Sequence, residues 1–372
     1  MPRVGVVDLP LHQGTAPRWL FGRMVKLSRG IIEVLVDEFG RSEFLQRISD
    51  PFWFQAFSCV LGFDWHSSGT TTVTCGAVKE ALRDQNLGLF VAGGKGRTSR
   101  RTPLEIERIT EKLKISEEIR ENLIYCSRMS AKVDSAAIQD QHTLYHHSLF
   151  FTLEGEWSVV QQGLNVESGY ARRYHWSSRH VKSFVDEPHD AIIGKRMQKA
   201  LDMTSSSSEA CRKTSLDIIK DNPRKLFQLI KSVRHPKQRT LSEWTGEEEP
   251  VLILSMPRNI NWETAKRVYD WQPQSYEELL SIKGVGPRTI RALALISELI
   301  YGSKPSWKDP VKYTFTVGGK DGVPYPVDKR TMDRTTEILR RGVEEAKLGK
   351  KERIRALQRL RNFLPGESIG PA

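Results

Sequence analysis

Apolar residues near the start of the chain recur at the spacing of an α-helix. One stripe is formed by Trp19, Met24, Leu27, Ile31 and Leu35. This spacing predicts a helix over these residues, and a second helix is predicted over 41–49. The stretch from Phe52 to Cys75 is rich in aromatic and β-branched residues and contains two glycines. It predicts a strand, a turn and a second strand, followed by a helix from Ala77.

The middle of the chain alternates between charged and β-rich segments. Residues 102–123 predict a charged helical stretch with a break at Ile115 and Ser116. Residues 144–153 and 157–162 have the pattern of two strands, and Glu154-Gly155-Glu156 has the composition of a turn. A β-hairpin is therefore predicted over residues 144–162, and residues 1–195 are expected to mix helices and strands.

The remainder of the chain predicts mostly helix. Residues 203–208 predict a flexible polar bend, residues 223–233 a helix, and residues 350–362 a basic closing helix. The expected fold class is α+β. Three parts are predicted: a mixed catalytic domain over 1–195, a helical connector over 196–250 and a helical DNA-binding domain over 251–372.

Composition narrows the class of protein. The chain has 372 residues, of which 38% are hydrophobic and 27% charged, which is typical of a globular protein. No stretch approaches the roughly 20 apolar residues that span a bilayer, so no membrane partner is expected. Its four cysteines lie far apart and form no Cys-x-x-Cys pair, which favours neither a disulfide framework nor a cysteine zinc site. A cytoplasmic location is the resulting expectation.

Charge divides the chain into two halves. Residues 1–190 contain equal numbers of acidic and basic residues, so the whole net charge of +12 falls in residues 191–372. An excess of this kind is typical of a region that faces a polyanion. A generally Lys- and Arg-rich surface is the alternative interpretation.

The strongest local pattern is Ser275 to Ile290. Ser275 and Glu278 form a capping box that starts a short helix. Two glycines follow, and Pro287 suits the first turn of a second helix. The residues expected to contact phosphate are Lys283, Gly284, Val285, Gly286, Arg288 and Thr289. Residues 271–301 resemble the helix-hairpin-helix motif of DNA repair proteins, which implies binding to the DNA backbone; an ordinary corner between two helices is the alternative.

Asp328 lies in the sequence Pro326-Val327-Asp328, before a predicted helix over residues 331–341. The context resembles that of the catalytic aspartate in helix-hairpin-helix DNA glycosylases, which implies a catalytic Asp328. Two features depart from that family: the spacing from Gly286 is longer, and Arg288 stands where lyase-active members have lysine. Alternatively, Asp328 caps the following helix.

Aspartates and histidines gather in the first region. Seven of the nine histidines lie between residues 66 and 189. Candidate catalytic residues are Asp64, His66, Asp134 and Asp140, and candidate metal ligands are Asp64, His66, Asp140, His146 and His147. Such side chains can hold Mg²⁺ or Mn²⁺, which would activate water against a phosphodiester. Because neighbouring strand residues point to opposite faces, only one of His146 and His147 can join a given site. Ordinary structural histidines are the alternative interpretation.

Residues 91–97, Val-Ala-Gly-Gly-Lys-Gly-Arg, lack the Walker A spacing. They predict a mobile basic loop in which Lys95, Arg97 and Arg100 touch phosphates, or simply a solvated loop.

Several short segments resemble an archaeal and bacterial family catalogued as domain of unknown function 763. They are residues 8–12, 16–20, 50–56, 64–69 and 172–176. The resemblance implies no activity, so function rests on the residues. The expected function is a DNA repair or processing nuclease with a metal-assisted Asp/His site. The alternatives are a DNA glycosylase acting through Asp328 and a nucleic-acid-binding adaptor without enzymatic activity.

Overall fold

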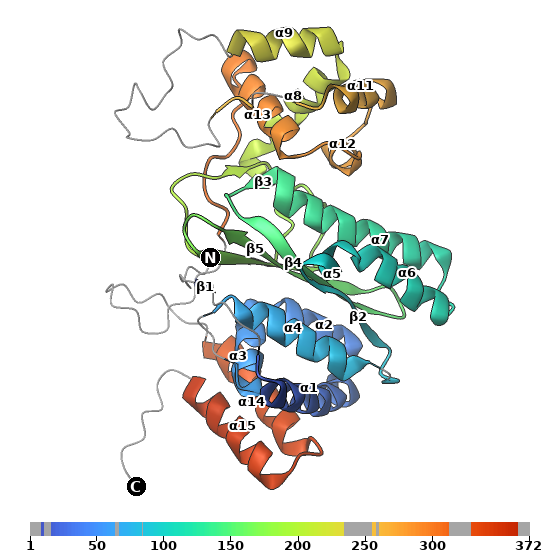
Figure 1. Cartoon of the computed structure of the whole chain (residues 1–372), viewed down its shortest axis with the longest axis vertical. Helices are drawn as coiled ribbons and strands as arrows, with labels where there is room; N and C mark the ends of the chain where they lie inside the picture. Colours follow the sequence, from blue (N-terminus) through green and yellow to red (C-terminus); the bar gives the residue numbers. More distant parts are fainter. Residues whose placement is uncertain are drawn as a thin grey trace.

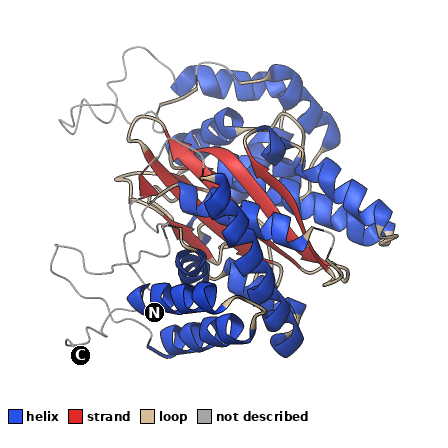
Figure 2. Ribbon diagram, turned by 60° about the horizontal axis from the view of Figure 1, so that its bottom comes forward, coloured by secondary structure: helices blue, strands red, loops and turns tan. Residues whose placement is uncertain are grey.

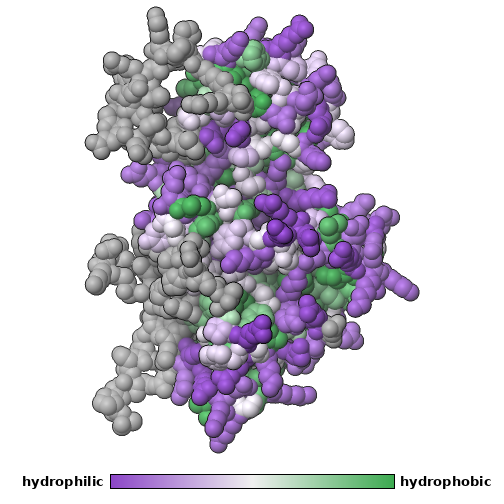
Figure 3. Space-filling view, viewed as in Figure 1, coloured by the Kyte–Doolittle hydropathy of each residue, from purple (hydrophilic) through white to green (hydrophobic). Residues whose placement is uncertain are grey.

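A computed structural model describes residues 9–10, 16–63, 67–83, 85–233, 255–257, 260–311 and 329–363. An antiparallel sheet lies between two layers of helices, and a further group of helices stands at one end of the molecule (Figures 1 and 2). The fold class is α+β, as predicted. No described helix has the length and apolar character to cross a bilayer, and hydrophilic residues cover much of the face drawn in Figure 3.

The central sheet has the strand order β1-β6-β5-β4-β2, and β7 pairs with β6. Its strands are β1 (Leu9–Pro10), β2 (Leu89–Lys95), β4 (Thr143–Thr152), β5 (Trp157–Asn165), β6 (Tyr170–Ser177) and β7 (Ala191–Ile193). The predicted hairpin is confirmed as β4 and β5. A two-stranded sheet pairs β3 (Ile138–Gln139) with β8 (Leu201–Asp202).

Successive residues of the central strands belong to two different hydrophobic cores. Leu149, Phe151 and Val159 lie in one core, whereas Phe150 and Val160 lie in the other. Side chains alternate between the faces of a strand, so helices cover both faces of this sheet. This double burial places most polar side chains of β4, β5 and β6 under a helical layer.

The layer below the sheet in Figure 1 contains α1 (Arg18–Phe39), α2 (Arg41–Ser49), α3 (Pro51–Leu61) and α4 (Gly69–Leu82). The first two helices are confirmed predictions. The strands predicted within residues 52–75 are wrong, because α3 and the first half of α4 occupy that stretch. Asp50 accepts a hydrogen bond from the Trp53 backbone N–H at 2.8 Å, and Pro51 fills the first turn.

Burial explains the error in residues 52–75. Trp53, Phe54 and Phe57 are fully buried, as are Val78 and Cys75 of α4. A helix buried on several sides loses the amphipathic period and carries the aromatic and β-branched residues that are typical of strands. Asp50-Pro51, a helix-start signature, was the signal that could have corrected the prediction.

The layer above the sheet contains α5 (Arg97–Arg100), α6 (Thr102–Lys112) and α7 (Glu117–Lys132). A π-helical turn, η1 (Val133–Ala137), continues α7. The predicted break is confirmed: Ser116 caps α7 by accepting a hydrogen bond from the Ile119 backbone N–H at 3.3 Å. Leu123, Cys126 and Met129 of α7 pack in the core that contains Leu149 and Phe151.

The helical group at the top of Figure 1 draws on two parts of the sequence. It contains α8 (Glu209–Lys220), α9 (Pro223–Val233), α11 (Trp262–Trp271), α12 (Tyr276–Ser281) and α13 (Pro287–Tyr301). The last described helices, α14 (Lys329–Glu345) and α15 (Lys350–Phe363), pack instead in the core of α1–α4, to which they contribute Ile338, Leu339, Val343, Ala356 and Leu360. The helices predicted over 223–233, 331–341 and 350–362 are therefore confirmed, and those after residue 251 lie at two ends of the molecule.

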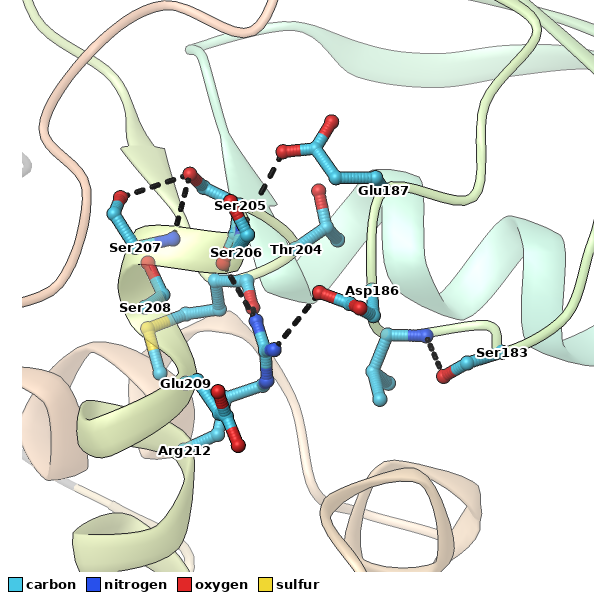
Figure 4. Close-up of polar contacts among 12 residues, drawn as sticks. Ser183, Asp186, Glu187, Thr204, Ser205, Ser206, Ser207, Ser208, Glu209 and Arg212 are labelled. Carbon is cyan, nitrogen blue, oxygen red and sulfur yellow. Dashed lines mark hydrogen bonds and ion pairs between the residues drawn. The ribbon is translucent and has the colours of Figure 1, made fainter.

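The serine-rich bend predicted over 203–208 is held by many hydrogen bonds (Figure 4). Arg212 donates to the carbonyls of Met203 and Ser205 at 2.8 and 2.7 Å and forms an ion pair with Asp186 at 3.1 Å. Ser208 is fully buried and ends a short 3₁₀ helix over 206–208. The prediction of a flexible segment is wrong because Arg212 supplies the partners that the local composition does not reveal.

Candidate nucleic-acid interface and buried polar clusters

The turn between α12 and α13, which we call the glycine turn, covers residues 282–286. Ser275 starts α12 by accepting a hydrogen bond from the Glu278 backbone N–H at 3.1 Å. Gly286 is the N-cap of α13, and no side chain caps this helix. The first backbone N–H groups of an α-helix have no partner within the helix, and the helix dipole makes this end electropositive.

The two glycines of the turn differ in what their positions demand. Gly284 has φ +99°, and a Cβ there would lie 2.3 Å from Thr264 Oγ1, so the fold itself requires glycine. Gly286 has φ −139°, which any residue adopts, and a Cβ there would meet only a carbonyl oxygen at 3.9 Å. The fold therefore does not require a glycine at position 286.

The glycine turn has charged side chains on its solvent side and buried side chains on its inner side. Lys283, Gly284 and Arg288 are exposed, whereas Val285 and Thr289 are buried. Arg267 of α11 donates to the Lys283 carbonyl at 2.9 Å, which brings a third cation to the turn. The residues predicted to contact phosphate thus fall into two groups. The buried side chains of Val285 and Thr289 hold the turn in place, whereas Lys283 and Arg288 remain accessible.

The start of α13 is fastened to the small sheet. Gln139 of β3 donates to the Pro287 carbonyl at 2.8 Å and accepts a hydrogen bond from Arg291 at 2.9 Å. Gln139 directly precedes Asp140 in the sequence. The start of α13, directly after the glycine turn, is therefore linked through Gln139 to Asp140 and the buried polar groups above the central sheet.

Asp140, a predicted catalytic residue and metal ligand, is held by an internal ion-pair network. It is 1% exposed, and its carboxylate accepts hydrogen bonds from Arg172 at 2.8 Å and from Tyr174 at 2.7 Å. Arg172 also binds Asp309 at 2.6 Å. Burial alone would raise the pKa of Asp140, but Arg172 and His142 hold it well below its usual range. Asp140 is therefore a structural anion in this arrangement.

Asp134, the other described candidate acid, lies in a second network. It is fully buried in η1, contacts His189 Nε2 at 2.5 Å, and accepts hydrogen bonds from Gln161 at 2.6 Å and Trp176 at 3.0 Å. Burial raises the pKa of Asp134, against the lowering effect of His189. Asp134 and His189 thus form a buried acid–base pair that is closed off from solvent.

His146 and His147 point to opposite faces of β4, as predicted. His147 contacts Gln161 Oε1 at 2.8 Å through Nδ1 and Ser127 Oγ at 2.9 Å through Nε2, so both ring nitrogens are occupied. His146 Nε2 lies 3.1 Å from Ser148 Oγ, and its Nδ1 has no hydrogen-bond partner. Within the described ranges, no three His, Cys, Asp or Glu side chains are grouped so that they could hold a metal ion.

The buried histidines predict a fall in stability in mild acid. Burial lowers the pKa of His147 to about 4 and that of His146 to about 3. Below about pH 6.5 these histidines bind protons in the unfolded chain but remain neutral in the folded protein. The free energy of unfolding should therefore fall as pH drops from 6.5 towards 4. We expect about 1.4 kcal/mol per pH unit for each histidine, measured by urea denaturation at several pH values. His147→Gln should flatten this slope, and an unchanged slope in the variant would contradict the assignment.

Lys95, Arg97 and Arg100 occupy a regular structure rather than the predicted mobile loop. Lys95 ends β2, which pairs with β4 along its length, and the two arginines lie on α5. Gly93 permits this packing, since a Cβ there would lie 2.2 Å from the His147 carbonyl oxygen. All three side chains are exposed and form a basic segment at the edge of the sheet.

Three predicted catalytic residues, Asp64, His66 and Asp328, lie outside the described residues. The sequence patterns missed Arg172, Arg173 and Asp309 as site residues. The available signal was the pair Arg172-Arg173 within a β-rich segment, because neighbouring strand positions deliver one arginine to each face of the sheet.

A family model described as "Protein of unknown function (DUF763)" matches residues 5–327. The chain belongs to this family, as the sequence resemblance indicated. No curated protein and no solved structure matches the chain.

Proposed function

We propose that this member of the family binds DNA, and that the glycine turn and the first turn of α13 contact backbone phosphates. The carrying observation is Gly286, a glycine that the fold does not require at the uncapped start of a 15-residue helix. A side chain at this position would stand between an incoming phosphate and the exposed N–H groups.

Charge around the turn supports the same proposal. Lys283 and Arg288 flank the helix start, and Arg267 is fastened to the turn. Backbone N–H groups and lysines contact phosphate without reading bases, so binding with little sequence preference is expected.

Gly286→Ala provides the direct test. The added methyl group has open space in the protein, so we expect unchanged stability but DNA affinity lowered by at least about tenfold. Fluorescence anisotropy with labelled single-stranded and duplex DNA measures the affinity. Gly22→Ala is the matched control, because Gly22 is exposed and an added Cβ also meets nothing within 4 Å.

The outcomes of this experiment are distinct. Equal affinity of Gly286→Ala and wild-type protein would remove the glycine turn from the interface, and absence of DNA binding at low salt would refute the proposal. A strong preference for RNA of the same sequence would replace DNA by RNA as the ligand.

Metal-assisted cutting of the bound strand remains a further proposal. Asp140 is engaged by Arg172, and Asp134 by His189. The proposal therefore depends on Asp64 and His66, which lie outside the described residues. Running the same DNA mixtures with Mn²⁺ and with EDTA reveals whether a metal-dependent product forms.

A further inference from the structure

A row of polar side chains crosses the face of the central sheet that α3 and α4 cover. The strand register pairs Lys95 with His146, His146 with Gln162, and Gln162 with Arg173. Directly opposed residues share a face of the sheet, so the four side chains lie on one side across β2, β4, β5 and β6. Neighbouring strands are about 4.8 Å apart, so the row spans roughly 14 Å.

Arg173 ends this row as a buried cation for which the described residues supply no counter-charge. Arg173 is 1% exposed, and it forms no ion pair with a carboxylate among the described residues. Its guanidinium donates to Gln55 Oε1 at 3.2 Å and lies 4.6 Å from the centroid of the Phe54 ring, but Nε and Nη1 have no hydrogen-bond partner. Its neighbour Arg172, on the other face, binds two carboxylates.

The groups that the structure describes around Arg173 are uncharged or basic. From α3 it meets Gln55 and Phe54, and Cys75 of α4 lies close enough to affect its pKa. His175 of the same strand is buried, and neither of its ring nitrogens has a side-chain partner. Burial lowers the pKa of Arg173 to about 10, so the guanidinium remains charged at neutral pH.

In the middle of the row, Gln162 is already hydrogen-bonded and His146 has one free ring nitrogen. Gln162 is fully buried and is oriented by hydrogen bonds with Thr71, with the Ser68 carbonyl at 2.8 Å, and with Tyr145. The Nδ1 atom of His146 has no hydrogen-bond partner. If Nε2 accepts the hydrogen bond from Ser148, the neutral ring carries its proton on Nδ1, which can then donate a hydrogen bond to a ligand. Lys95, at the other end of the row, is exposed.

We propose that this row is a binding site for a phosphate group, and that Arg173 is its principal counter-charge. A buried unpaired charge is strongly destabilising, whereas an oxyanion would satisfy the free guanidinium N–H groups. The exposed Lys95 and Arg97 would raise the local concentration of anions at the solvent end of the row. This site is separate from the glycine turn and lies on the opposite face of the sheet from Asp140.

The test compares ligand response with intrinsic stability. Thermal unfolding and calorimetric titration are carried out with inorganic phosphate on wild-type protein and on Arg173→Gln. We expect phosphate to stabilise the wild-type protein, and Arg173→Gln to weaken phosphate binding by at least about tenfold. Without phosphate, Arg173→Gln should be at least as stable as the wild-type protein, because it removes an unpaired buried charge.

Arg47→Gln is the matched control. Arg47 is also buried, at 7% exposed, but it is paired with Glu43, so this variant should lose stability and keep its phosphate response. If Arg173→Gln does not fold, Arg173→Lys replaces it, and we expect this variant to bind phosphate more weakly than the wild-type protein in the calorimetric titration. Two results would overturn the site: no phosphate response in the wild-type protein, or an unchanged response in the Arg173 variants.

A second arm identifies the source of the phosphate. A dinucleotide with a 5′-phosphate is titrated beside the same dinucleotide without it. Tighter binding of the phosphorylated form that depends on Arg173 indicates a nucleic-acid end, whereas a response to inorganic phosphate alone indicates a free anion. Gly286→Ala should leave both titrations unchanged, so the phosphate site can fail or succeed independently of the glycine turn.

Discussion

Arg172→Met should be among the most destabilising single substitutions in this protein. Arg172 is fully buried and pairs with Asp140 and Asp309, whose side chains are each 1% exposed. Removing the cation leaves two buried carboxylates without a counter-charge. The expected loss is about 3–5 kcal/mol in the free energy of unfolding, measured by urea denaturation at neutral pH.

Two comparisons show whether the charges cause this loss. Arg120→Met breaks an exposed pair with Glu117 and should cost less than about 1 kcal/mol. Adding Asp140→Asn and Asp309→Asn to Arg172→Met should recover part of the stability, because it removes the stranded anions. A loss that the added substitutions do not reduce would indicate a packing effect of Arg172 rather than an electrostatic one.

The same network has a defined acid signature. The folded state holds the pKa of Asp140 below its usual range, so the stability from this group is present above about pH 4. It is lost as pH falls further, once the unfolded chain is protonated and the folded carboxylate is not. This window lies below the one expected for His147, and the two effects can be separated in a single pH series.

Lys283→Glu combined with Arg288→Glu should remove most of the DNA affinity. Both side chains are exposed beside the uncapped start of α13, so charge reversal places two carboxylates where phosphates are proposed to bind. We expect affinity to fall by roughly a hundredfold, and the slope of log affinity against log salt to decrease by about 2. Anisotropy titrations over a range of salt concentrations measure both quantities.

Lys112→Glu combined with Lys114→Glu makes the same change in net charge elsewhere. These exposed lysines lie at the end of α6, above the central sheet. If this control lowers affinity as strongly as the variant at the glycine turn, binding follows overall charge and the local interface is refuted. Arg97→Glu with Arg100→Glu asks separately whether the basic edge of the sheet contributes.

Local patterns predicted those parts of the fold whose signals are local. Ser275 with Glu278, and Ser116 ahead of α7, mark helix starts by hydrogen bonds within one turn of chain. The hairpin of β4 and β5 was predicted because its turn and both strands are contiguous. The stretch containing α3 and α4 was misread, because burial on several sides removes the amphipathic period by which helices are recognised.

The candidate sites divide in the same way. The charge and conformation of the glycine turn could be predicted because its residues adjoin in sequence. The ion pairs of Asp140 could not, since its partner Arg172 lies 32 residues away, and Arg172 in turn bonds Asp309, which is 137 residues from it. No pattern in a single segment indicates that Asp134 meets His189, 55 residues away.

The sequence by itself determined the α+β class, several helix limits, the concentration of positive charge in residues 191–372 and the form of the glycine turn. Only the tertiary structure decided which acidic and basic groups are engaged in ion pairs and hydrogen bonds inside the protein. It engages Asp140 and both nitrogens of His147, and within the described part of the chain it gives the buried Arg173 no carboxylate partner. The physical reason is that hydrogen bonding and helix capping act over a few residues of chain, whereas burial and ion pairing depend on which distant segments the fold brings together.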